Sequence, residues 1–203
     1  MRLLAAVAAM TVLGAVDGRP IGADDVVEAR SGVKFATKNG SESLLGVGLR
    51  TRTFLKVKVY AIGLYVADAA LAGPLAAYKG KTESPGFYAE LVNGDFDKQV
   101  TLKFVRDVGQ ETIQEAMRDA LVGADKARLD AFVSYFPEVK VGQECVLRWG
   151  TGGVLETTMT GQTRPPIADK AFASRVFGIW LGEKPLQADI KKDLVARASA
   201  LIK

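Results

Sequence analysis

RTRTFLKVKVYAIGLYVAD, residues 50–68, begins with two arginines and continues as an alternation of apolar and polar residues. Such alternation is typical of a β-strand, and we expect one from Phe54 to about Val66. The pattern predicts one face with Lys56, Lys58, Tyr60 and Ile62 and an opposite face with Val57, Val59, Ala61 and Gly63. The two lysines would extend to water. Two interpretations stay open: a strand with one wet face, or an anion held by Arg50 and Tyr60.

The rest of the chain contains separate groups of strands and helices. Glycine-containing turns predict hairpins at residues 39–40 and 151–153, and alternation predicts a strand within residues 98–108. Apolar residues at helical spacing predict helices within 109–123, 125–138 and 167–185, short helices after Gly73-Pro74 and within 87–96, and a closing segment, 186–203, with one apolar face. This segregation favours an α+β fold, an antiparallel sheet with helices packed on one face.

Composition excludes several classes of site. The chain has 203 residues, of which 48% are hydrophobic, and a net charge of +4 without a dense basic block, so we expect no nucleic-acid partner. It contains no histidine, which excludes Ser-His-Asp triads and histidine metal sites. The single cysteine, Cys145, cannot form an intrachain disulfide and is expected to be buried and inert. We expect a monomer with neither metal nor cofactor.

Residues 1–18 have the pattern of a signal peptide. Arg2 precedes an apolar run from Leu3 to Val16, and small residues follow. The run is short for a membrane span, which needs about 20 apolar residues, although an uncleaved anchor is the alternative. We therefore expect an exported protein, periplasmic or secreted, whose mature domain, 24–203, has no transmembrane segment.

Three sequence patterns together resemble the chalcone isomerase-fold family, in particular its bacterial chalcone isomerase-like branch. They are GVGLRTR leading into FLKVKVYAIGLYVAD (46–68), FVRDVGQETIQEAM (104–117) and IADKAFASRVFGIWLGEKP (167–185). The resemblance runs from about Gly32 to the end of the chain. The family includes plant chalcone isomerases and plastid fatty-acid-binding proteins. It implies an antiparallel sheet covered by helices, with a ligand cleft between the two layers.

The resemblance also implies where an isomerase site would lie. The plant isomerases have an arginine before the long strand, a threonine within it, and Tyr, Lys and Asn on a helix. The arginine corresponds to Arg50 and is retained, whereas Tyr60 stands in place of the threonine. The three helix positions hold Thr112, Glu115 and Asp119, which helical spacing places on one stripe.

Most groups of the isomerase site are therefore replaced. A later Thr or Ser of the plant enzymes falls on Ala173. A lysine on the helix would attract a substrate phenolate, whereas carboxylates at Glu115 and Asp119 would repel it. The alternative for these two carboxylates is an ordinary solvated helix face.

Three functions stay open. The first is a non-catalytic protein that binds a fatty acid or similar small amphipathic acid, with Arg50 and Tyr60 on the carboxylate, as the fatty-acid-binding members imply. The second is an isomerase or intramolecular lyase with a divergent site, and the third a structural envelope protein with a filled cleft. Against a ligand site, Arg50 could pair with Asp107 and Tyr60 could simply pack in the sheet. Tyr65, Trp149 and Trp180 are expected to be core aromatics.

Overall fold

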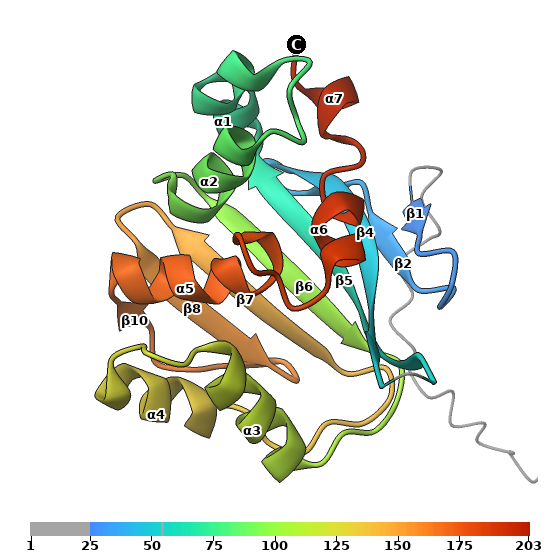
Figure 1. The fold of residues 1–203 in the computed structure, drawn as a ribbon, viewed down its shortest axis with the longest axis vertical. Helices are drawn as coiled ribbons and strands as arrows, with labels where there is room; N and C mark the ends of the chain where they lie inside the picture. Colours follow the sequence, from blue (N-terminus) through green and yellow to red (C-terminus); the bar gives the residue numbers. More distant parts are fainter. Residues whose placement is uncertain (1–24, 54) are drawn as a thin grey trace, which may run out of the picture.

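A computed structural model describes residues 25–203 except residue 54, so the predicted signal peptide, residues 1–18, lies outside the described residues. The chain folds as α+β, with a long antiparallel sheet and helices over one face, which confirms the predicted class (Figure 1). The strand order in the main sheet is β10-β8-β7-β6-β5-β4-β3, and β9 pairs with β8. Strands β1 and β2 form a separate two-stranded sheet.

Both predicted hairpins and both predicted strands are present. The two small strands are β1 (Asp25–Val27) and β2 (Lys34–Ala36). The main sheet contains β3 (Lys38–Asn39), β4 (Glu42–Arg52), β5 (Val57–Ala67), β6 (Lys98–Phe104), β7 (Glu144–Gly150), β8 (Val154–Met159), β9 (Gln162–Thr163) and β10 (Ile167–Ala168).

The helices follow the apolar periodicity of the sequence, with two differences. They are α1 (Asp68–Ala72), the 3-10 helix η1 (Pro74–Tyr78), α2 (Pro85–Asn93), α3 (Gln110–Ala120), α4 (Lys126–Ser134), α5 (Lys170–Leu181), α6 (Ala188–Asp193) and α7 (Ala198–Leu201). Helix α1 was not expected, and the closing segment divides into α6 and α7. Of the helices within residues 25–203, none combines the length and apolar character that crossing a membrane requires.

The core lies on both faces of the sheet. The larger part fills the space between sheet and helices and includes Trp149 and Trp180, while Tyr65 packs with Phe35 on the face covered by β1 and β2. The three predicted core aromatics are therefore confirmed. Cys145 is fully buried as predicted, and burial raises the pKa of its thiol, which keeps it protonated and unreactive.

A β-bulge changes the faces of β5 relative to the sequence pattern. The register shifts between the pairs Arg50–Tyr60 and Thr51–Lys58, so Val59 is an extra residue. Val59 and Tyr60 consequently both face the helical layer and line one cavity. Lys58 instead donates to a backbone carbonyl of the β1–β2 loop on the opposite face. The prediction that Lys58 shares a face with Tyr60 is wrong because alternation does not anticipate an inserted residue.

Strand β5 also begins later than predicted. Thr53 and Lys56 have positive φ angles of 65° and 51°, a conformation typical of turns, and β5 starts only at Val57. Lys56 and Lys58 are exposed at this end, as predicted for lysines that extend to water.

The C-terminal segment covers the edge of β4. Gln187 accepts a hydrogen bond from the Thr51 amide at 3.1 Å and donates to the Leu49 carbonyl at 3.3 Å. Arg197 donates its amide to the Leu45 carbonyl at 2.8 Å. These contacts satisfy edge groups that would otherwise be open to pairing with another strand, and they fix the C-terminal segment beside Arg50.

Candidate functional site

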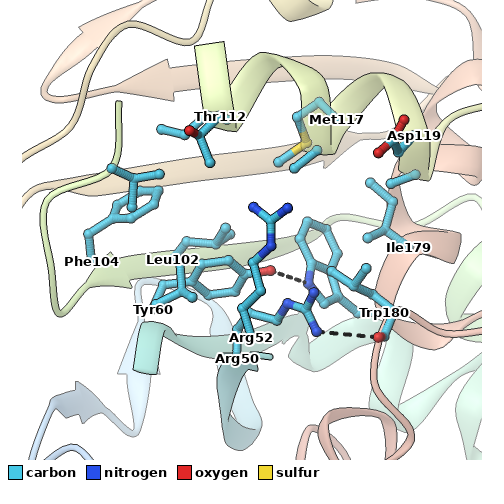
Figure 2. Close-up of a pocket in the computed structure, with 16 residues that line it drawn as sticks. Arg50, Arg52, Tyr60, Leu102, Phe104, Thr112, Met117, Asp119, Ile179 and Trp180 are labelled. Carbon is cyan, nitrogen blue, oxygen red and sulfur yellow. Dashed lines mark hydrogen bonds between the residues drawn. The ribbon is translucent and has the colours of Figure 1, made fainter. Parts of the chain in front are cut away.

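A cavity of about 270 Å³ lies between strands β4–β6 and helices α3 and α5 (Figure 2). Its wall is mainly apolar, with Leu102, Phe104, Ile113, Met117, Ile179 and Trp180. Its polar side chains are Arg50, Arg52, Tyr60, Thr112 and Asp119. An apolar pocket with a few convergent polar groups is the usual form of a small-molecule site.

Arg50 lies at this cavity and is only loosely held by the protein. Its Nη1 donates to the Leu186 carbonyl and to Gln187 Oε1, both at 3.4 Å, the long end of the hydrogen-bond range. The alternative pairing with Asp107 is wrong, because that carboxylate accepts from the Val141 amide and pairs with Lys140. The Arg50 guanidinium can therefore turn towards a ligand at little cost.

Arg52 is a second guanidinium that the sequence interpretation did not nominate. Figure 2 shows it directed into the cavity towards α3, above Tyr60 and Trp180. Within residues 25–203, Phe54 aside, it makes no salt bridge and its side chain donates no hydrogen bond. The spacing of two residues from Arg50 in "RTR" places both on one face of a strand, and this signal could have identified it.

The hydroxyl oxygen of Tyr60 already accepts a hydrogen bond. Trp180 Nε1 donates to its hydroxyl oxygen at 3.0 Å (Figure 2), so the hydroxyl proton is left to donate elsewhere. Burial raises the pKa of Tyr60 to about 12, although the Trp180 hydrogen bond and the Arg50 charge oppose the rise. Tyr60 is thus a neutral hydrogen-bond donor at ordinary pH.

The other positions implied by the family resemblance divide into two groups. Thr112 and Asp119 line the cavity from α3, together with Ala116. Glu115 lies on the same helical stripe but is exposed and does not line the cavity, which fits the alternative of a solvated helix face. Ala173 is buried in the core away from the cavity and offers no polar group.

The polar groups of the cavity favour an anion. Arg50 and Arg52 supply two positive charges against the one carboxylate of Asp119, and Tyr60 adds a neutral donor. Within the described part of the chain, no group of three or more His, Cys, Asp or Glu residues could hold a metal ion. The site can therefore bind an acidic head group beside an apolar wall.

Comparison with known proteins assigns the chain to a family. A family model described as "Chalcone isomerase-like" matches residues 28–196. The chain belongs to the chalcone isomerase-like family. This match lies inside the predicted domain, 24–203. It accounts for the resemblance of the strand and helix patterns.

Relatives of this chalcone isomerase-like protein carry two kinds of name. This chain is 25% identical to a chalcone–flavanone isomerase of Phaseolus vulgaris, over 72% of this chain and 76% of the relative. It is also 25% identical to fatty-acid-binding protein 1 of Arabidopsis thaliana, over 88% of this chain and 72% of the relative. The crystal structure of an Arabidopsis thaliana fatty-acid-binding protein superposes with a TM-score of 0.73 and 22% identity, covering 88% of this chain and 99% of that one. That likeness establishes the chalcone isomerase-like fold.

Proposed function

We propose that this protein binds a fatty acid or a similar small amphipathic acid in the cavity. The observation that carries the proposal is the convergence of Arg50, Arg52 and Tyr60 on an apolar cavity of about 270 Å³. A carboxylate matches the planar donor fork of a guanidinium, and the phenol adds one donor. The apolar wall then excludes water from the tail. The names of the fatty-acid-binding relatives support this proposal.

Replacing the cationic groups should weaken binding of a fluorescent fatty acid. A hydrogen bond to a charged group contributes about 1.5–3 kcal/mol, so Arg50→Ala and Arg52→Ala should each raise the Kd roughly ten- to a hundredfold. Tyr60→Phe removes one neutral donor and should cost about 0.5–1.5 kcal/mol. Fluorescence titration measures each Kd, and melting curves report the stability of each variant.

Arg118→Ala is the matched control. Arg118 is exposed like Arg52 and lies on α3, but it pairs with Asp130 at 2.6 Å and does not line the cavity. Exposed pairs contribute little to stability, and the Kd should stay unchanged. The proposal fails if the wild type shows no saturable binding, or if Arg50→Ala and Arg52→Ala lower the melting temperature while leaving the Kd as it was.

The cavity supports the two alternative functions less well. An isomerase that closes a ring from a phenolate would place that anion near Asp119, whose negative charge opposes it. Arg50 and Tyr60 could still stabilise a developing enolate, so a chalcone is a useful second compound in the titration. The structural alternative predicts a filled cleft, whereas the cavity is open and, within the described residues, the Arg52 guanidinium at its wall makes no salt bridge.

We also propose that the protein is exported, on the evidence of the Arg2-then-apolar N-terminus. The intact mass of protein isolated from its native host should correspond to a chain that lacks about the first 18 residues. A soluble cytoplasmic form that retains Met1 to Val16 would contradict export. The bacterial origin and the monomeric state likewise stay predictions.

A further inference from the structure

Three loops meet at one end of the main sheet, where β5 begins and β6 ends (Figure 1). They are residues 52–53 and 55–56, where β4 ends, residues 105–109 and residues 137–143, together called the loop end. The Val141 amide donates to Asp107 Oδ1 at 2.9 Å, which joins the second and third loops. The first and second loops line a common hollow of about 320 Å³. The loop end is thus one continuous surface.

Two large apolar side chains project from this surface into water. Leu55 is 70% exposed and Val141 is 64% exposed. Each stands at a turn, where neither packs into the core clusters. Moving apolar side chains of this kind from water into the acyl region of a lipid bilayer is favourable, because it removes apolar surface from water.

The charges around these side chains are mainly positive. Within the described residues, Arg52, Lys56 and Arg106 make no salt bridge, while Lys140 pairs with Asp107 at 3.5 Å and also with Glu138. Unpaired basic residues next to exposed apolar ones are the combination that binds anionic membrane surfaces.

The loop end is also continuous with the cavity. The hollow and the cavity share Arg52, Val59, Val108 and Thr112 in their walls. An amphipathic molecule leaving a lipid surface at the loop end could therefore reach the cavity along one wall.

We propose that the loop end docks on an anionic lipid bilayer, with Leu55 and Val141 entering the interface and Lys56 and Arg106 facing the lipid head groups. The proposal of docking depends only on the observations at the loop end. Delivery of a ligand along the shared wall rests additionally on the proposed function.

Flotation of the full chain with lipid vesicles tests the docking. The wild type should float with vesicles of phosphatidylcholine mixed with phosphatidylglycerol, and much less with phosphatidylcholine alone or at high salt. Leu55→Asp and Val141→Asp should each weaken the binding about tenfold or more. Val122→Asp is the matched control, since Val122 is 76% exposed beyond the end of α3, outside the loop end, and the variant adds the same charge.

The outcomes separate docking from ligand binding. The proposal is overturned if the wild type does not bind the mixed vesicles at low salt, or if Val122→Asp weakens binding as much as Leu55→Asp does. All the variants contain the same apolar N-terminus. If that segment caused the vesicle binding, the wild type and all the variants would bind the vesicles equally, and this result would also overturn the docking proposal. Titration of the same variants with a fluorescent fatty acid in solution reports the proposed function independently, and Leu55→Asp should leave that Kd unchanged.

Discussion

Gly46→Ala should destabilise the protein by about 3 kcal/mol or more and lower its melting temperature by roughly 6–12 °C. A Cβ at this position would lie 2.1 Å from the Asp193 carbonyl oxygen and 2.7 Å from the Leu194 carbonyl carbon. Both are backbone atoms, so no rotamer change relieves the overlap, and the end of α6 would have to move away from β4. Thermal and urea unfolding of the two proteins measure the loss.

Gly48→Ala is the control for this substitution. It lies two residues along on β4 and faces the same helix, but its Cβ would stand 3.4 Å from Asp193 Cβ, an ordinary contact. Its effect should be small. Gly46→Ala should also weaken ligand binding, because displacing α6 also moves the preceding Leu186, which lines the cavity. Equal stability of the two variants would show that α6 docks without needing a glycine on β4.

The sequence was sufficient for the fold because its signals are local. Alternation in residues 57–67 and in β6, the turns at Gly40 and Gly152, and the apolar periodicity of α3 and α5 each act within a few residues. The closing segment was harder, since its division into α6 and α7 depends on contacts with β4 such as that of Arg197 with the Leu45 carbonyl.

The candidate site was predictable only in part, for a different reason. Arg50 and Tyr60 are register partners on adjacent strands, so proximity in sequence and resemblance to the family were enough to pair them. The bulge at Val59 was not foreseeable from a pattern of period two, and it sets which residues of β5 face the helices. Arg52 was overlooked because it matches no family position, although its spacing from Arg50 placed it on the same face. The hydrogen bond from Trp180 to Tyr60 joins residues 120 positions apart and needs the tertiary structure.

Lys98, at the start of β6, is a fully buried cation. Its Nζ donates to the Gly94 carbonyl at 2.7 Å and lies 3.9 Å from the centre of the Trp149 ring and 4.6 Å from that of Phe96. Burial lowers the pKa of Lys98 to about 7, although the charges of Glu90 and Asp95 oppose the change. The ring faces and the carbonyl offset only part of the cost of removing the ammonium from water.

Lys98→Met should therefore stabilise the protein at neutral pH by about 1–4 kcal/mol, because an apolar side chain of similar length replaces a buried charge. The folded-state pKa of Lys98 lies below its unfolded value of about 10.4, so between these values the unfolded chain holds one more proton. The loss of stability caused by burying the charged Lys98 is fully present below about pH 7 and becomes smaller as the pH rises. Relative to Lys98→Met, the wild type should gain about 1.5–2 kcal/mol of unfolding free energy from about pH 7 to about pH 8.5.

This pH window isolates Lys98 because the chain has no histidine to titrate there. The unfolded-state ionisation of Cys145 is common to both proteins and cancels in their difference. Lys191→Met is the control, since Lys191 also donates to a backbone carbonyl, that of Gly182 at 2.7 Å, and lies 4.3 Å from the Tyr88 ring centre, but remains partly open to water. That variant retains Lys98 and should keep the pH dependence of the wild type. If Lys98→Met proves less stable at pH 7 and its pH dependence matches the wild type, the aromatic rings stabilise the ammonium enough to outweigh its burial.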